Sequence, residues 1–309
     1  MATLKTTDVK HVREDLGNYI SMISPEKTPF KTEIGKSKAT STWHEFLTDE
    51  LAPANAANAR LEGADANEAD NRGPARIGNR TQIFAKEVTI ANTLQAVDTA
   101  GARNEKARQI TKAGAELNRD IEAALVSANP SASTPGMLGG AEAWIKTNAL
   151  HGTGGSTAGF ANNNVGAVTD GDEQELTVEL LNKLFGQIWE AGGNAAQVIA
   201  PGKVKQTISA LAGGVGVWQT PAEKKTIYAG VDYYVSDFGV HEIIPHHFMT
   251  KTTLIAFDKD LWNVATLRGI TKNELAKTGD SDKVQIITEL TLECLNEAGN
   301  GKIADIKVN

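Results

Sequence analysis

The side chains best suited to chemistry by type and spacing lie between residues 154 and 158. The run Gly154-Gly155-Ser156-Thr157-Ala158 comes close to the serine-hydrolase elbow, in which a sharp turn exposes a nucleophilic hydroxyl. Ser156 could use His241 or His246 as its base, but no acidic partner can be assigned. The run lacks the motif's final glycine and lies in a Gly/Ser/Ala-rich stretch rather than after a clear strand. We therefore interpret it as a loop and keep the serine hydrolase as a minor alternative.

Two further segments could bind a metal or a phosphate. His241, His246 and His247 have no acidic or cysteine residue at a ligand-like spacing, and Pro245 predicts a turn there, so we expect a surface or interface role. Gly213-Gly214-Val215-Gly216 lacks the lysine and Ser/Thr of a phosphate-binding loop and follows a predicted helix instead of a strand. We expect neither segment to hold a metal or a cofactor.

The carboxylates of Glu116, Asp120 and Glu122 could act as an acid and base pair. They lie on one predicted helix with Lys112 and Arg119 close by, which is the usual charge pattern of a solvated helix surface. We expect no catalytic residue here, and we interpret the chain as a protein without enzymatic activity.

Composition excludes several classes of protein. The 309 residues suffice for one large domain or two ordinary ones, and 31 Lys and Arg against 38 Asp and Glu give a net charge of -7. Such a chain repels polyphosphate overall and is not a basic nucleic-acid binder. Cys294 is the single cysteine, which excludes an intrachain disulfide and indicates a small buried residue. No transmembrane or secretory segment is evident, so we expect no membrane partner.

The first ninety residues predict an arm followed by a hairpin. Residues 1–36 carry one short apolar stripe and are then broken by proline and glycine, which predicts an arm that needs another surface to lie on. Residues 39–51 and 76–90 are rich in β-branched and aromatic residues and predict two long strands. Residues 52–75 between them have almost no large apolar side chains, so this loop cannot form a core.

A long helix is predicted next, from an N-cap at Asp98 or Thr99 to about Ser127, before Asn129-Pro130. Its apolar face holds Ile110, Gly114, Leu117, Ile121 and Leu125. At 1.5 Å per residue it would be roughly 40 Å long. That length indicates a structural spine.

An α/β region is predicted between residues 176 and 257. The helix Leu176–Glu190, capped by Thr177, presents an apolar face made of Leu180, Leu181, Leu184, Phe185, Ile188 and Trp189. Strands are expected at residues 197–200, 227–236 and 253–257, and a further helix at residues 203–211.

The last fifty residues predict a long amphipathic strand at residues 283–295. One face would carry Val284, Ile286, Thr288, Leu290, Leu292 and Cys294, and the other face Gln285, Glu289, Thr291 and Glu293. Residues 261–268 and 302–308 are its expected antiparallel neighbours. The long helix needs such an apolar sheet face to cover its own stripe.

The order of these elements resembles the major capsid, or major head, proteins of tailed bacteriophages with the Hong Kong 97-type fold. The local sequence is similar as well, in segments that span nearly the whole chain: Ile23-Ser24-Pro25, Thr28-Pro29-Phe30, Trp43-His44-Glu45-Phe46, Glu62-Gly63-Ala64, Asn79-Arg80-Thr81-Gln82-Ile83, Glu116-Leu117, Arg119-Asp120-Ile121-Glu122, Asn296-Glu297 and Gly301. No single segment is diagnostic, and the resemblance depends on their order.

The resemblance implies an α+β fold with four parts. Residues 1–36 would be the N-terminal arm, 37–90 the E-loop hairpin, 91–135 with 259–309 the peripheral domain with the spine helix, and 136–258 the axial α/β domain. It also implies self-assembly into pentamers and hexamers of an icosahedral shell. In the family each E-loop lies over a neighbour's peripheral domain.

The implied function is structural. The shell would assemble in the host cytoplasm, form the virion capsid and enclose double-stranded DNA as non-specific cargo. Its other expected partners are a portal and scaffolding or decoration proteins. Scaffold would be a separate protein or absent, and we expect no covalent crosslink. An encapsulin-like shell is the alternative within the fold. Candidate contacts between subunits are Trp43, Phe46, Arg60, Glu62, Arg72, Arg76, Arg80, Arg103, Arg108, Arg119 and Trp218.

Overall fold

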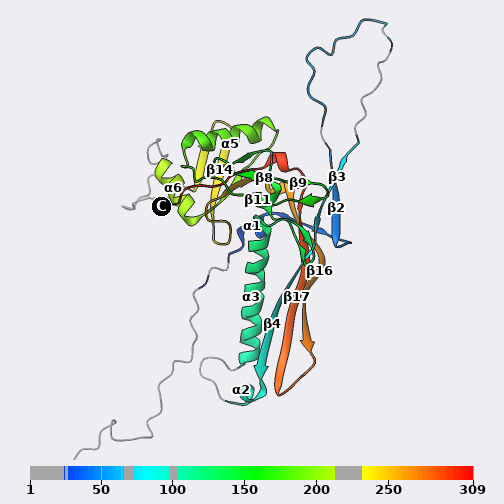
Figure 1. The fold of residues 1–309 in the computed structure, drawn as a ribbon, viewed down its shortest axis with the longest axis vertical. Coiled ribbons are helices and arrows are strands. Elements are labelled where there is room, and N and C mark those ends of the chain that lie inside the picture. The colour runs from blue at the N-terminus through cyan, green and yellow to red at the C-terminus, as the bar shows by residue number, and fades with distance from the viewer. Residues whose placement is uncertain are drawn as a thin grey trace, which may run out of the picture. The chain divides into compact units, whose positions relative to one another are not determined.

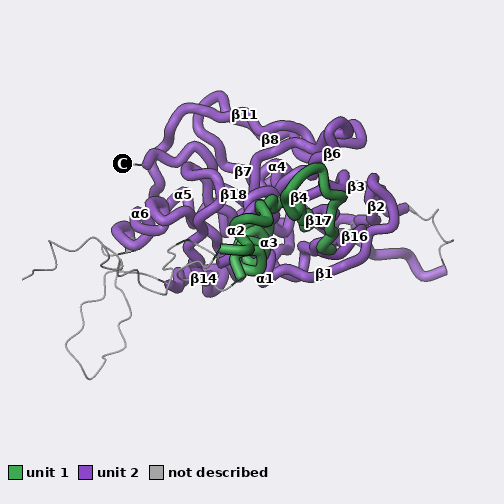
Figure 2. Tube along the Cα trace, turned by 90° about the horizontal axis from the view of Figure 1, so that it is seen from below, with its two compact units in different colours: residues 1–26, 85–117, 271–287 green, residues 27–84, 118–270, 288–309 purple. Residues whose placement is uncertain are grey.

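The computed structural model describes residues 24, 27–49, 51–63, 65, 73–97, 104–212 and 232–308. The chain divides into two compact units, coloured separately in Figure 2: residues 1–26, 85–117 and 271–287 form one, and residues 27–84, 118–270 and 288–309 form the other. Helices and sheets are both present, as the α+β prediction requires. The predicted stripe at residues 16–23 lies outside the described residues.

The elements labelled in Figure 1 have the following bounds. The helices are α1 (Pro29–Glu33), α2 (Asn92–Ala96), α3 (Glu105–Leu125), α4 (Ala141–Trp144), α5 (Val178–Glu190) and α6 (Gly202–Ala212), with short 3-10 turns at Lys259–Leu261 and Glu297–Gly299. The strands are β1 (Gly35–Lys38), β2 (Trp43–Thr48), β3 (Ala75–Arg80), β4 (Gln82–Ala91), β5 (Ala132–Ser133), β6 (Gly136–Met137), β7 (Ala149–Leu150), β8 (Ser156–Thr157), β9 (Phe160–Ala161), β10 (Asn164–Val165), β11 (Val168–Thr169), β12 (Gln197–Pro201), β13 (Tyr233–Ser236), β14 (Gly239–His246), β15 (Leu254–Phe257), β16 (Trp262–Leu275), β17 (Ser281–Cys294) and β18 (Gly301–Ile303).

A six-stranded sheet in the order β13-β14-β12-β15-β18-β7 forms the centre of the second unit. α5 and α6 cover one of its faces with a core that includes Leu184, Val198, Val204 and Leu254. A Cβ at Gly301 on β18 would come within 2.7 Å of Leu184, so a larger residue there would require the Leu184 side chain to shift. The Thr177 side chain accepts from Leu180 N and caps α5, which confirms the predicted cap.

Part of the predicted arm belongs to the core. Phe30 of α1 is fully buried, and its ring packs edge-on against Phe257 at 5.1 Å and Trp262 at 5.9 Å between ring centroids. Burying a side chain of this size contributes roughly 1.5–3 kcal/mol. β1 then pairs in parallel with β16, starting at Gly35 opposite Asn263. The arm prediction is therefore wrong for residues 29–36, because one large aromatic side chain fixes this segment.

A four-stranded sheet has the order β1-β16-β17-β4. Along β17 burial alternates up to Thr288, as predicted, but beyond it Glu289, Thr291 and Glu293 are also buried. Contrary to the prediction, the strand is therefore not amphipathic in burial at these three positions, because each of these side chains is buried with a polar partner in the described chain. Residues 302–308 were expected beside this strand, yet β18 pairs with β15 and β7 in the six-stranded sheet.

Helix α3 is shorter than the sequence predicts. It has 21 residues, about 32 Å at 1.5 Å per residue, and it starts at Glu105, where the Asn104 side chain accepts from Ala107 N at 3.0 Å. Asp98 and Thr99, the predicted caps, lie outside the described residues. Leu117, Ile121 and Leu125 are buried as predicted.

The predicted long hairpin is divided at Thr81. β2 and β3 pair antiparallel, from Trp43 opposite Arg80 to Thr48 opposite Ala75. Thr81 N then donates to Thr42 O at 2.8 Å, and the chain continues as β4 in the four-stranded sheet. Two strands were correctly predicted here, but the second one serves two different sheets.

Two details of the α/β region were wrongly predicted. Pro245 does not make a turn: it lies in β14, opposite Ala200 of the parallel strand β12, and His241 and His246 are buried in the same strand. Trp189, predicted on the apolar face of α5, has 60% of its surface exposed. The segment 227–231, expected to begin a strand, lies outside the described residues.

Candidate functional site

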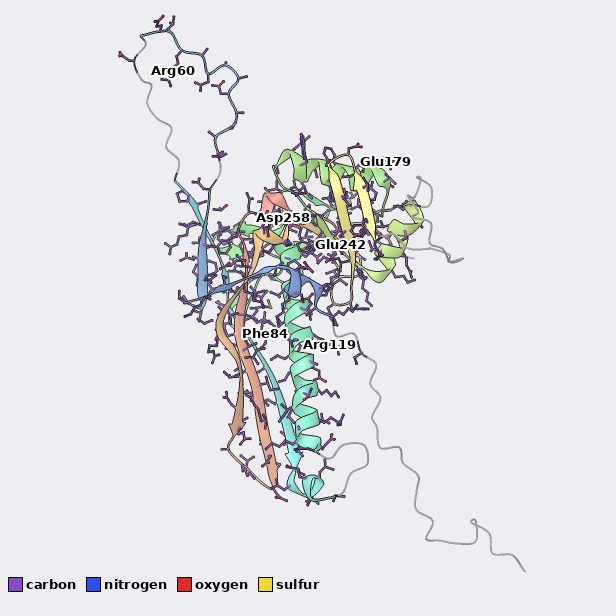
Figure 3. The ribbon with its side chains drawn as sticks, turned by 180° about the vertical axis from the view of Figure 1, so that it is seen from behind. Arg60, Phe84, Arg119, Glu179, Glu242 and Asp258 are labelled. Carbon is purple, nitrogen blue, oxygen red and sulfur yellow. The ribbon has the colours of Figure 1, made fainter. Side chains whose placement is uncertain are left out.

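The loop between β2 and β3 has no core of its own. Residues 51–63 are all exposed, and among them Leu51 and Leu61 have 97% and 86% of their surface exposed. Arg60 lies in this loop, away from the sheets, in Figure 3. Isolated apolar side chains on a surface are common, but here they lie on a long segment that touches little else. Binding to another surface would therefore stabilise this loop more than it stabilises a segment that is already packed.

The base of the hairpin is tied to its own chain. Trp43 stacks with Phe160 at 6.5 Å between ring centroids, and the Arg80 guanidinium lies 5.1 Å above the Trp43 ring. Phe46 packs against the fully buried Trp144 at 6.0 Å. Three candidates for contacts between subunits therefore already have partners within the described chain, and their contact with a neighbour remains a prediction.

The other contact candidates are distributed over the molecule. Arg76 forms an exposed ion pair with Glu45, and Arg108 Nε donates to Glu105 at 2.8 Å. The Arg119 guanidinium lies 5.3 Å above the ring of Phe248. Arg60 and Glu62 are exposed in the loop, whereas Arg72, Arg103 and Trp218 lie outside the described residues.

A buried carboxylate holds α1 in place. Glu122 Oε1 accepts from Phe30 N at 2.8 Å, and Oε2 accepts from Lys31 N at 3.0 Å. His246 Nε2 lies 2.8 Å from Glu122 Oε1, and both side chains are completely buried. The prediction that Glu122 is an ordinary surface charge is wrong. Of the surface or interface role predicted for His246, the surface part is wrong as well.

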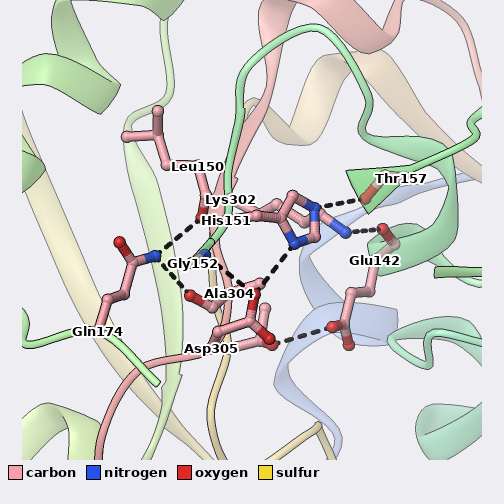
Figure 4. A network of polar contacts seen from close by, with 10 residues as sticks. Glu142, Leu150, His151, Gly152, Thr157, Gln174, Lys302, Ala304 and Asp305 are labelled. Atoms are coloured by element: carbon pink, nitrogen blue, oxygen red, sulfur yellow. Dashed lines mark hydrogen bonds and ion pairs between the residues drawn. The ribbon is translucent and has the colours of Figure 1, made fainter. Parts of the chain in front are cut away.

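Three buried side chains form a relay that the sequence reading missed (Figure 4). His151 Nδ1 lies 3.3 Å from Asp305 Oδ2, and Nε2 lies 2.8 Å from Thr157 Oγ1. Burial, followed by the charge of Lys302, lowers the pKa of His151, so the neutral ring donates to Asp305 and accepts from the threonine hydroxyl.

This order of hydroxyl, imidazole and carboxylate is the one used to activate nucleophiles. Thr157, however, has only 8% of its surface exposed, and Asp305 also accepts from Gly152 N at 3.1 Å. The three side chains join β7, β8 and the segment after β18, so the relay fixes these loops. No sequence signal could have found it, because His151 and Asp305 lie 154 positions apart.

A buried lysine lies next to this relay. Lys302 Nζ donates to the backbone oxygen of Glu142 at 2.7 Å, and the Glu142 carboxylate accepts from the hydroxyls of Thr250 and Thr253. Burial lowers the pKa of Lys302 to about 8, although the nearby carboxylates of Glu142 and Asp305 oppose this shift. Removing one partner would leave the others without a hydrogen bond in a dry environment.

The residues suspected of catalysis do not come together. Ser156 is exposed on β8, while His241 hydrogen bonds with Ala195 O at 2.6 Å and Ser236 Oγ at 2.7 Å. His246 is occupied by Glu122. His247 is exposed, as predicted, and the segment 213–216 lies outside the described residues. Neither histidine proposed as a base is therefore available to Ser156.

The described residues offer no cluster of three or more His, Cys, Asp or Glu side chains that could hold a metal ion. Within the same residues, no helix has both the length and the apolar character needed to cross a bilayer. Cys294 is fully buried, as predicted, and burial raises the pKa of its thiol well above the usual range.

Comparison with known sequences gives one consistent result. A family model described as SU10 major capsid protein matches residues 2–307. The major capsid protein of Escherichia phage Phieco32 is 25% identical over 321 residues, which cover 92% of this chain and 91% of that protein.

Solved structures are similar over nearly the full length. The capsid of cyanophage A-1(L) has a TM-score of 0.68 at 12% identity and covers 98% of this chain and 99% of its own. The capsid of a native GTA particle has a TM-score of 0.67 at 11% identity, covering 98% of both chains. An encapsulin from Synechococcus elongatus PCC 7942 has a TM-score of 0.57 at 10% identity and covers 100% and 98%. At these identities the likeness shows the fold alone.

Proposed function

Because the chain belongs to the SU10 major capsid protein family and has the Hong Kong 97-type fold, we propose that it forms the icosahedral head shell of a tailed phage by self-assembly. The match of the family model to residues 2–307 is the observation that carries this conclusion. Pentamers and hexamers of this one chain would build the shell.

The exposed hairpin loop supports assembly as its role. Residues 51–63 expose all their side chains, whereas the base of the hairpin is packed on its own chain. We propose that this E-loop lies over the next subunit and becomes ordered there. The free energy of that contact would then stabilise both the loop and the shell.

The domain division follows the same proposal. Residues 91–135 with 259–300 would form the peripheral domain, and residues 136–258 the axial domain. We add β18 to the axial domain, because it hydrogen bonds with β15. The four-stranded sheet and α3 would then supply the peripheral layer.

We also propose a cargo and partner proteins for the shell. A net charge of -7 suits a container for double-stranded DNA, because a strongly basic wall would bind phosphate and impede packaging and release. Assembly in the host cytoplasm, a portal, and a separate scaffolding or decoration protein belong to this proposal. We assign the chain no catalytic role, since His241 and His246 are both engaged away from Ser156.

Sizing with light scattering and negative-stain microscopy of the full-length chain tests the proposal. We expect rings of five and six subunits, or closed shells, when the chain is expressed alone or with its scaffold. A monodisperse monomer under both conditions would refute self-assembly. Hydrolase activity lost on Ser156→Ala would restore the enzyme alternative.

A further inference from the structure

One edge of the six-stranded sheet is unusually apolar for a surface. β13 is the terminal strand of the sheet, and Tyr233, Val235, Phe238 and Val240 expose 61%, 71%, 40% and 57% of their surfaces. Val235 is directly opposite Val240 in the β13–β14 pair, so their side chains share one face. We call these four residues the apolar edge. An exposed strand edge with apolar side chains is a template for contact with another chain.

The apolar edge carries negative charge. Asp237 is exposed in the turn between β13 and β14, next to Phe238. Glu242 lies opposite Tyr233, and both residues line a hollow in which Asp258 and Asp260 outnumber the one cation, Lys259. Figure 3 shows Glu242 and Asp258 in this part of the sheet. The complementary surface should therefore be apolar and basic.

A second hollow, of about 450 Å³, has that character. It is lined by Lys203, Lys307, Glu175, Leu176, Ala210 and Val308, among others, and we call it the lysine hollow. Lys307 is half exposed, and its weak pair with the largely exposed Glu175 spans 3.9 Å. Lys307, beside the apolar side chains of Ala210 and Val308, matches an acidic, apolar turn.

The two surfaces lie at opposite ends of α5. The Phe238 ring packs against Trp189 near the C-terminal end of the helix, at 5.6 Å between ring centroids. Leu176, in the lysine hollow, directly precedes the Thr177 cap. From Thr177 to Trp189 the helix rises about 18 Å at 1.5 Å per residue. The surfaces therefore cannot meet within one chain, but they can meet between two copies arranged head to tail.

We propose that the apolar edge of one subunit docks into the lysine hollow of the next copy of this chain, with Asp237 facing Lys307. Such a contact joins two different surfaces, and its repetition closes a ring when the rotation between copies allows it. This inference rests on the proposed function, because it names the contact that would build a pentamer or hexamer. Burial of the four apolar side chains would supply affinity, and the charges would fix the orientation.

Cysteine pairs test the contact, because the native Cys294 is buried and does not compete. Full-length Asp237→Cys/Lys307→Cys should give a ladder of disulfide-linked species beyond the dimer on a non-reducing gel after mild oxidation. The matched control Asp237→Cys/Lys251→Cys uses another exposed lysine position, and it and each single variant should give no species beyond the dimer.

Charge reversal gives an independent readout. Asp237→Lys and Lys307→Glu should each cause a loss of rings and shells, and the double reversal should restore them. If the wild type assembles but the cysteine pair gives no ladder beyond its control, the inference is overturned while the proposed function stands. If the wild type does not assemble at all, both are overturned.

Discussion

The β2–β3 hairpin loop and the six-stranded sheet belong to the same chain but obtain their stability in opposite ways. The sheet has a dry core with Leu184 and Ile255, and even its buried polar groups, such as Lys302, have partners within the chain. The loop places Leu51 and Leu61 in solvent. The difference teaches that the sheet obtains its contacts within the chain, whereas residues 51–63 leave their side chains uncovered.

Loss of the Glu122 carboxylate should produce the largest effect on the sheet side of this comparison. In Glu122→Ala, the amides of Phe30 and Lys31 and the ring of His246 lose their buried partner. We expect the free energy of unfolding to fall by about 3–5 kcal/mol, measured by urea denaturation of the unassembled subunit. The control Glu116→Ala removes a partly exposed carboxylate from the same helix and should change little. Equal effects of the two substitutions would show that the buried carboxylate is not what holds α1.

The buried Lys302 gives a second test of the six-stranded sheet, through the pH dependence of its stability. Its pKa is about 8 in the folded chain and 10.5 when unfolded, so the unfolded chain binds more protons between these pH values. Wild-type stability should therefore rise relative to Lys302→Met as pH increases from 8 to 10.5, by about 3 kcal/mol at most. Urea titrations of both proteins at several pH values measure this difference. A constant difference across that range would contradict the lowered pKa.

Substitutions in the hairpin loop should leave the subunit stable and damage the assembly. Because Leu51 and Leu61 touch little of their own chain, Leu51→Ser/Leu61→Ser should change the free energy of unfolding by no more than about 0.5 kcal/mol. The yield of shells should fall clearly. Asn58→Ser, a polar change in the same loop, serves as the control. A normal yield of shells from the double variant would contradict the view that the loop serves assembly.

The smallest effect is expected at a partly exposed ion-pair cluster around Asp282. Lys277 first, then Lys106 and Gln95, lower the pKa of Asp282 well below its usual range through hydrogen bonds to its carboxylate. A lowered carboxylate pKa means that this contribution is lost only in strong acid, as pH falls through the folded value. Asp282→Asn should change stability little at pH 7, and less still at high salt, in urea titrations at two ionic strengths. A large loss that high salt does not reduce would contradict this view of the cluster.

Local signals predicted part of the fold correctly. The Thr177 cap, the apolar stripe of α3 and the alternation of β17 up to Thr288 each depend on neighbours within a few residues. The exposed loop was also correctly predicted over its described residues 52–63, because its composition cannot bury surface. The four-part order of the chain that was inferred from these features stays a prediction.

Long-range partners account for most of the failures. Glu122 has the spacing of a surface charge, and only the approach of Phe30, 92 positions away, makes it a buried anchor. Pro245 indicates a turn, yet it lies in β14 opposite Ala200. The sequence of residues 29–36 indicates an arm. In the structure, however, the rings of Phe257 and Trp262 pack against Phe30. The relay of His151, Thr157 and Asp305 joins segments that no local pattern links.

Cryo-electron microscopy of particles formed by the full-length chain tests the central claim most directly. We predict an icosahedral shell built from pentamers and hexamers of this subunit, in which residues 51–63 of each copy lie against a neighbour. Particles without icosahedral symmetry, or a shell in which those residues remain exposed on every copy, would contradict the account.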